Sequence, residues 1–204
     1  MTSFSELIRD CSDTQSGVIL DFDSLDDDIF VDCYESWNVI FKHRVETDGF
    51  AQNWTTMREG FDRNVLYDTT EAPTNEYWIG NEALHQLTSR YPYILRIDMW
   101  TQEGTYEYAE FDGFSVASEN DAYTLTLTNY RAGSAGPGGL VTYHSGKPFS
   151  TVDRDNSRNC SYEEGVAWWF LDEEDIVLDA SEDMPEGLEI IPGGLEGKSW
   201  FIVL

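Results

Sequence analysis

Basic residues are scarce in this 204-residue chain, because 12 lysines and arginines stand against 39 aspartates and glutamates, for a formal net charge of −27. Such a surface repels phosphate backbones and anionic membranes, so nucleic acid and lipid headgroups are unfavourable partners. It attracts cations, and calcium is the hard cation that carboxylate oxygens suit best. Long apolar runs are lacking too, since none approaches the roughly 18 residues that a membrane helix needs. We therefore expect no membrane span.

Cysteine and histidine are also few, with three of each. Three cysteines allow one disulfide and one leftover thiol in a secreted chain, or ordinary buried thiols in a cytosolic one. No serine lies in a Gly-x-Ser-x-Gly elbow, and neither a zinc cluster nor a phosphate-binding glycine loop is present. No pattern identifies paired carboxylates for glycoside chemistry. We expect no enzyme and no catalytic residues. Residues 1–6 lack a basic stretch and an apolar segment, which predicts that this chain carries no signal peptide.

Aromatic and hydrophobic residues are plentiful, at 14% and 41% of the chain, which is enough to bury a sizeable core. Alternation of apolar and polar residues predicts strands at 37–41, 93–100, 105–111 and 122–129, with a turn at 102–104. Helical spacing predicts short helices at 81–90, starting at the capping-type Asn81, and at 55–61, with Thr55 or Thr56 near the cap. Strands with occasional short helices predict a single α+β domain.

One acidic loop is a candidate metal site. Asp153 and Asp155 are separated by one residue, so both carboxylates can converge on one ion where the backbone curls. Carbonyl oxygens of the following residues can complete the shell of about six to eight oxygens that calcium requires. The loop is no EF-hand, because Arg158 stands where that motif needs glycine. The alternative is a solvated Asp/Asn turn. A second acidic run, residues 21–28, is interpreted as a solvated loop.

Aromatic residues follow this loop closely, namely Tyr162, Trp168 and Trp169. Flat apolar faces beside a calcium site suit sugars or acetyl groups, because they pack against C–H and methyl groups. The alternative is that the tryptophans belong to the core. Asn53-Trp-Thr and Asn159-Cys-Ser match the glycosylation acceptor pattern, which short sequences also match by chance and which matters only in a secreted chain.

Several segments together resemble a known family. They are Arg9-Asp-Cys, Ser16-Gly-Val, Cys33 with 37–44, 50–54, Arg58-Glu-Gly-Phe, 77–88, Leu95-Arg-Ile-Asp, Gly133-Ser-Ala-Gly, 149–156, Asn159-Cys and Gly165-Val-Ala-Trp-Trp. In this order they resemble the fibrinogen C-terminal domain, also called the fibrinogen-related domain. The resemblance implies one α+β domain over residues 9–170, with a mainly antiparallel sheet, short helices and a loop-rich calcium and ligand region. Residues 171–204 are then a divergent acidic segment packed on the same domain.

The resemblance also implies a calcium site and a disulfide. The calcium ligands would be the carboxylates of Asp153 and Asp155 and backbone carbonyls near Ser157 and Asn159. Cys11 and Cys33 correspond to the first disulfide of the family. The partner cysteine that the family offers to Cys160 is absent here, so this thiol can link two chains into a homo-oligomer.

The family includes lectins of the ficolin and tachylectin type, whose acetyl pocket lies beside calcium. By position that pocket implies ligand contacts from Asn159, Cys160, Tyr162 and Trp168, with a peptide before the cysteine that is often cis. The resemblance therefore predicts a secreted, calcium-binding recognition module for acetylated carbohydrate or glycoprotein, of the innate-immune type. Two alternatives remain open: an acidic structural or adhesive extracellular protein that has lost the lectin pocket, and a receptor ligand.

Overall fold

The computed structural model describes residues 11, 18–20, 29–31, 33–34, 36–43, 51–61, 76–101, 105–137, 144–157, 161–162, 167–170 and 198–203. The acidic run at 21–28, the turn at 102–104 and residues 171–197 lie outside these ranges. The helices are α1 (Trp54–Glu59), α2 (Asn81–Arg90) and the 3-10 helix η2 (Glu119–Asp121). The strands are β1 (Val18–Leu20), β2 (Ile29–Val31), β3 (Cys33–Tyr34), β4 (Trp37–His43), β5 (Tyr77–Trp78), β6 (Tyr93–Thr101), β7 (Tyr106–Val116), β8 (Leu125–Thr126), β9 (Asn129–Gly133) and β10 (Lys198–Val203).

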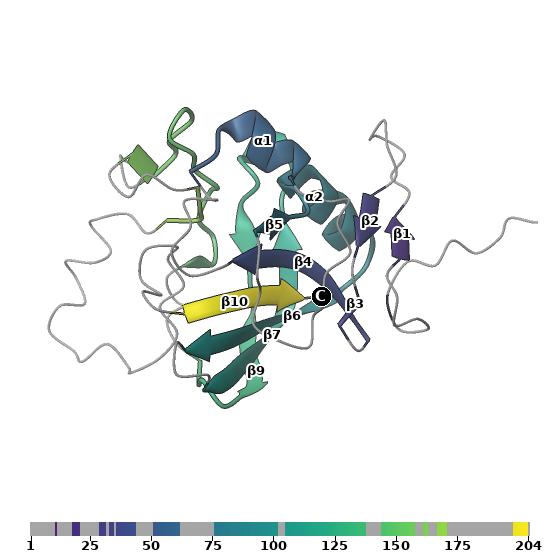
Figure 1. Cartoon of the computed structure of the whole chain (residues 1–204). Coiled ribbons are helices and arrows are strands. Elements are labelled where there is room, and N and C mark those ends of the chain that lie inside the picture. The colour runs from purple at the N-terminus through teal and green to yellow at the C-terminus, as the bar shows by residue number, and fades with distance from the viewer. Residues whose placement is uncertain are drawn as a thin grey trace, which may run out of the picture.

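An antiparallel sheet forms the centre of the molecule. Within the described residues it has eight strands, in the order β3-β4-β10-β6-β7-β8, with β5 paired to β4 and β9 paired to β7. Figure 1 shows β10, in yellow, between β4 and β6. This strand belongs to the C-terminal segment, and it pairs with a strand on each side, so it is a central strand of the sheet. The expected α+β class with a mainly antiparallel sheet is confirmed. None of the described helices has the length and hydrophobicity needed to cross a bilayer.

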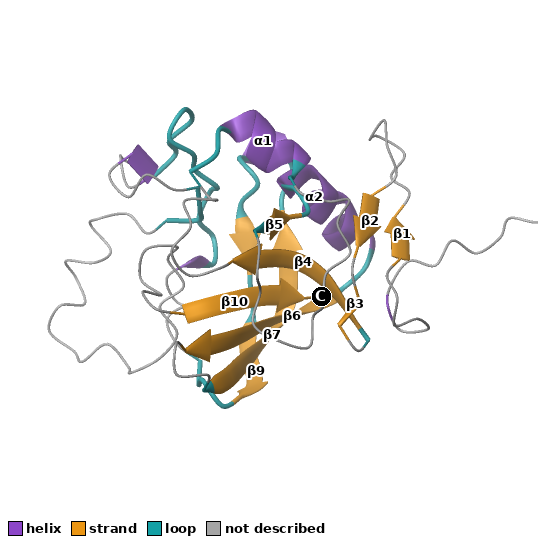
Figure 2. Ribbon diagram, viewed as in Figure 1, coloured by secondary structure: helices purple, strands orange, loops and turns teal. Residues whose placement is uncertain are grey.

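The two longer helices lie side by side on one side of the sheet (Figure 2). α2 is fixed to β7 by the backbone N–H of Val116, which donates to Thr88 Oγ1 at 3.0 Å. The side chains of Leu95, Ile97 and Met99 alternate along β6 and are all buried, as the period-two pattern predicts. Each such side chain stabilises the fold by about 1.5–3 kcal/mol relative to an exposed one.

Both predicted helices are confirmed; α2 has the predicted bounds, α1 covers 54–59 instead of 55–61, and both caps differ from the expected ones. α1 begins after Asn53, whose side-chain oxygen accepts a hydrogen bond from Thr56 N at 2.9 Å, so asparagine and neither threonine is the cap. α2 starts after Gly80, which has no side chain for capping. A Cβ on Gly60 would lie 2.5 Å from Ile79 O, and one on Gly80 would lie 2.8 Å from Arg58 O. The end of α1 and the start of α2 are thus in backbone contact, which fixes the position of α1.

The strand predicted at 122–129 is wrong in its first part. Ala122 and Tyr123 have positive φ values of 50° and 48°, and β8 covers only Leu125–Thr126. The cause is the turn that ends η2, where Ala122 N donates to Glu119 O and Tyr123 N donates to Ser118 O. The face assignment still holds, because Tyr123, Leu125 and Leu127 are all buried.

A disulfide joins Cys11 to Cys33, as the resemblance predicts, with a Cα–Cα distance of 5.5 Å. Both cysteines are buried. The backbone N–H of Cys11 donates to Asn38 Oδ1 on β4 at 3.0 Å. The bond therefore fastens an N-terminal residue to the edge of the main sheet.

Candidate functional site

The acidic loop at residues 150–157 is closed against the core by backbone hydrogen bonds. Ser150 and Trp168 exchange two of them, at 2.9 and 3.0 Å, and Thr151 and Arg154 exchange two more at 3.1 Å. Asn156 Nδ2 donates to Phe149 O at 2.7 Å. These bonds hold a tight turn at residues 151–154, in which residues 152–154 are exposed to solvent.

Asp153 is anchored to two neighbours. Its Oδ1 accepts hydrogen bonds from Thr151 Oγ1 at 2.7 Å and from the backbone N–H of Trp54 at 2.9 Å. Trp54 is the first residue of α1, where backbone N–H groups have no partner within the helix and where negative charge is favourable. The carboxylate thereby ties the loop to α1 across 99 positions of sequence.

Asp155 is oriented by Ser157. Its Oδ1 accepts from the backbone N–H of Ser157 at 2.7 Å and from the hydroxyl of Ser157 at 2.5 Å. Its Oδ2 is buried and has no hydrogen-bond partner among the described residues. A buried polar atom without a partner costs about 1–3 kcal/mol, and more if it is charged. A cation bound at Oδ2 would offset that cost, so this atom fits a metal ligand.

The donors that this loop offers to a metal are oxygen atoms. No group of three or more His, Cys, Asp or Glu side chains gathers around a common point in the described part of the chain. A metal here would therefore use the carboxylates of Asp153 and Asp155 together with backbone oxygens, and an all-oxygen set of this kind suits a hard cation. Ser157, one of the two expected carbonyl donors, is 2% exposed and adjoins Asp155. Asn159, the other, lies outside the described residues.

A cation–π stack fixes the side chain of Arg154, the residue between the two aspartates. The guanidinium carbon of Arg154 lies 3.8 Å from the centroid of the Trp54 ring, and Arg154 Nη1 lies 3.3 Å from Glu119 Oε1. The same carboxylate oxygen accepts the indole N–H of Trp54 at 2.7 Å. The Trp54 ring stacks in turn on Tyr123, with centroids 5.7 Å apart. Sequence reasoning missed this network, because nothing local in the sequence pairs residues so far apart.

The expected ligand residues divide into two groups. Tyr162 is 70% exposed, so its ring is available to a ligand. Trp168 is 2% exposed and lies in the core, so its position does not support the expected ligand contact. Asn159, Cys160 and the peptide between them lie outside the described residues, so their expected roles, including a link between two chains through Cys160, stay predictions.

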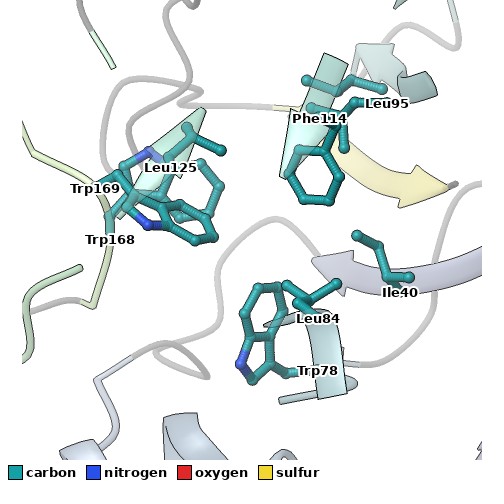
Figure 3. Close-up of a pocket in the computed structure, with 9 residues that line it drawn as sticks. Ile40, Trp78, Leu84, Leu95, Phe114, Leu125, Trp168 and Trp169 are labelled. Carbon is teal, nitrogen blue, oxygen red and sulfur yellow. The ribbon is translucent and has the colours of Figure 1, made fainter. Parts of the chain in front are cut away.

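Trp168 and Trp169 line a cavity of about 20 Å³. Figure 3 shows the two rings beside Leu125, with Trp78 and Leu84 across the cavity. The lining is apolar, so a water molecule in this cavity would find few hydrogen-bond partners.

Two buried hydrogen bonds hold the segment that contains Trp168 and Trp169 in place. His144 Nδ1 donates to Trp169 O at 2.8 Å, and Trp169 Nε1 donates to Tyr123 O at 2.7 Å. Burial lowers the pKa of His144 below its ordinary value, although the bond to Trp169 opposes the shift. Burial raises the pKa of Tyr123, and its hydrogen bond to Glu82 adds to the shift. Both side chains are therefore neutral near pH 7, and they act in packing rather than in chemistry.

Together these features define a disulfide-bonded α+β domain that carries an acidic, oxygen-rich loop beside a short helix. The family described as fibrinogen beta and gamma chains, C-terminal globular domain, matches residues 22–178. The chain belongs to this family.

Similar curated proteins support the family assignment. The fibrinogen gamma chain of Petromyzon marinus is 34% identical over 148 residues, which cover 65% of this chain and 33% of the relative. Human angiopoietin-4 is 32% identical over 148 residues, covering 70% and 27%, and mouse angiopoietin-related protein 6 is 37% identical over 137 residues, covering 66% and 27%. The chain thus spans about a third or less of the length of these relatives.

Solved structures give the same result. The lamprey fibrin D-dimer, complexed with the peptide ligand Gly-His-Arg-Pro-amide, superimposes with a TM-score of 0.66 at 28% identity, covering 80% of this chain and 57% of that one. The fibrinogen-like globe domain of human ANGPTL6 superimposes with a TM-score of 0.65 at 31% identity, covering 80% and 74%. The fold is therefore that of a fibrinogen-like globular domain.

Proposed function

We propose that this chain is an extracellular, calcium-binding recognition module that binds a partner and catalyses no reaction. The observation that carries the proposal is the buried Oδ2 of Asp155, which lacks a hydrogen-bond partner among the described residues. The Cys11–Cys33 disulfide supports the location, because disulfides persist in oxidising compartments. Fibrinogen gamma chains and angiopoietins among the relatives support a binding role.

A bound calcium ion would supply the positive charge that lets two neighbouring carboxylates share one site. Asp153 and Asp155 would hold the ion, with the carbonyl of Ser157 as a further donor. Ser157 orients Asp155 through two hydrogen bonds, and Trp54 N–H with Thr151 Oγ1 orients Asp153. These bonds orient each carboxylate without an ion, which would reduce the ordering cost of binding one.

The partner that fits best is a basic segment of another protein. The net charge of −27 attracts cationic groups. The lamprey fibrin relative binds a short peptide that contains histidine and arginine. Exposed apolar groups stand on the loop and just after it, at Val152 (43% exposed) and Tyr162 (70% exposed), and such groups serve as contact points in interfaces.

The second candidate is an acetylated sugar, and the observation that favours it is the exposed ring of Tyr162. An aromatic face packs against sugar C–H and methyl groups. Trp168 has no part in this version of the pocket, because it is buried. A third possibility, an acidic adhesive protein, predicts many weak calcium sites instead of one.

Calorimetric titration with calcium tests the shared part of these proposals. We expect one site in the wild-type chain and a loss of at least tenfold in affinity in Asp155→Asn. Glu107→Gln is the matched control, because it removes one β7 carboxylate that has no ion pair within the described ranges. Many weak sites that respond equally to both substitutions would support the adhesive alternative.

A second titration, in saturating calcium, separates the two partners. The probes are Gly-His-Arg-Pro-amide and N-acetylglucosamine, each added to the wild-type chain and to Tyr162→Ala. Binding of the peptide that disappears when salt is raised supports the basic partner, because screening weakens exposed charge contacts. Binding of the sugar that Tyr162→Ala abolishes supports the lectin function.

A further inference from the structure

The start of α1 carries an acceptor sequence for N-linked glycan, Asn53-Trp54-Thr55. Asn53 and Thr55 are exposed, whereas the Trp54 between them is 7% exposed and packs inward. The two residues that define the acceptor therefore both face solvent, on the surface of the folded domain. From this arrangement we infer that Asn53 is N-glycosylated when the chain passes through a secretory pathway. The inference rests on the proposed extracellular location.

The hydrogen bonding of Asn53 leaves the reacting atom available. Its Oδ1 accepts from Thr56 N at 2.9 Å and caps α1, while its Nδ2 makes no hydrogen bond to any residue that the structure describes. Glycosylation forms a bond between Nδ2 and the first sugar carbon of a lipid-diphosphate-linked oligosaccharide. The bond from that carbon to the diphosphate breaks, the lipid diphosphate leaves, and Nδ2 loses one proton. The carbonyl oxygen is unchanged, so the glycosylated residue keeps its capping bond.

The second acceptor sequence in the chain is placed differently. It is Asn159-Cys160-Ser161, whose asparagine lies outside the described residues. The hydroxyl residue of this sequence, Ser161, is 0% exposed, and its backbone N–H donates to Ser157 Oγ at 3.3 Å. The described part of this sequence thus belongs to the interior beside the acidic loop. The two sequences are alike as motifs, and burial distinguishes them.

A glycan at Asn53 would stand beside the acidic loop. The next residue, Trp54, donates its backbone N–H to Asp153 and carries Arg154 against its ring. Figure 1 shows the start of α1 next to this loop, which is drawn in green. The glycan would therefore border the candidate calcium site, and it would obstruct a large partner that approaches the loop from the side of α1.

The test is secretion of the full chain from animal cells behind a heterologous leader, followed by enzymatic release of N-glycans in heavy-oxygen water and peptide mapping. We expect a loss of mass on release and conversion of Asn53 to heavy-oxygen aspartate. Thr55→Ala and Asn53→Asp should lose the modification, Asn53→Asp while keeping a capping side chain, and Thr55→Ser and Ser161→Ala should retain it. Secreted, folded wild-type protein with unmodified Asn53 would overturn the inference.

The outcome is separable from that of the proposed function. Calcium titration of protein made in bacteria, which carries no such glycan, measures the acidic loop alone. An unmodified Asn53 with a working calcium site overturns only the glycosylation inference, and a modified Asn53 with no calcium site overturns only the proposed function.

Discussion

The Asp155→Asn variant should be more stable than the wild-type chain without calcium, and less stable than the wild-type chain with calcium. In calcium-free solution the wild-type chain keeps a carboxylate oxygen buried without a hydrogen-bond partner in the described part of the structure. Asparagine retains the Oδ1 acceptor for Ser157 and removes the charge from a chain whose net charge is already −27. The amide carries no charge at the atom that lacks a partner, and we expect this gain to exceed the cost of leaving its N–H unpaired, so the calcium-free protein should be stabilised by up to about 1 kcal/mol.

Calcium acts in the opposite direction. A ligand that binds only the folded state, present at 100-fold excess over its Kd, adds about 2.7 kcal/mol to the free energy of unfolding. The wild-type chain receives this increment, and the variant, with one carboxylate fewer, receives less. The wild-type chain should therefore be the more stable of the two in saturating calcium, by about 1–2 kcal/mol.

Urea unfolding followed by tryptophan fluorescence measures both orders, first with a chelator and then with calcium. The urea midpoint of the Glu107→Gln control should respond to calcium in the same way as that of the wild-type chain. A variant that is less stable than the wild-type chain without calcium would refute the argument from the buried oxygen. A wild-type midpoint that does not respond to calcium would refute the cation site itself.

Three further predictions concern the scaffold. Replacing Cys11 and Cys33 with alanine should lower the free energy of unfolding by about 3 kcal/mol, because a bond across 22 positions restricts the unfolded chain, and an unchanged urea midpoint would contradict this. Leu84→Ala, at a fully buried position beside the cavity, should cost about 2–5 kcal/mol in calorimetric unfolding, and a cost below about 1 kcal/mol would show that the site collapses freely. Burial lowers the pKa of His144 from 6.5 in the folded chain, so the unfolded chain takes up a proton at higher pH. The free energy of unfolding should therefore fall as the pH drops below 6.5. Parallel urea titrations of His144→Gln should lose this part of the pH dependence.

Local patterns in the sequence predict much of the scaffold. α2 follows from apolar residues at helical spacing, and β6 follows from the alternation of Leu95, Ile97 and Met99, because both patterns describe how one face of an element is buried. The disulfide and the family follow from motifs whose order along the chain is specific. Ala122 and Tyr123 escaped prediction, because turn hydrogen bonds from η2 overrode an alternating pattern that favours a strand.

The candidate site was predictable only in part. Two aspartates with one residue between them are visible in the sequence, but the partners that orient them are not. Trp54 reaches Asp153 from 99 positions away, and Glu119 reaches Arg154 from 35 positions away. Contacts of this kind arise from the packing of whole elements, which a local pattern does not encode. For the same reason, the sequence left undecided whether Trp168 contacts a ligand or lies in the core, where the structure places it.

The position of β10 has a consequence for how the chain is made. β4 and β6 lie on either side of this strand and bond to it, yet it follows them by about a hundred residues or more. A growing polypeptide therefore leaves both strands with open edges until residue 203 has emerged from the ribosome. Open strand edges invite pairing with other chains, so we expect incompletely synthesised chains to be prone to aggregation. The central sheet can therefore close only after β10 has been made.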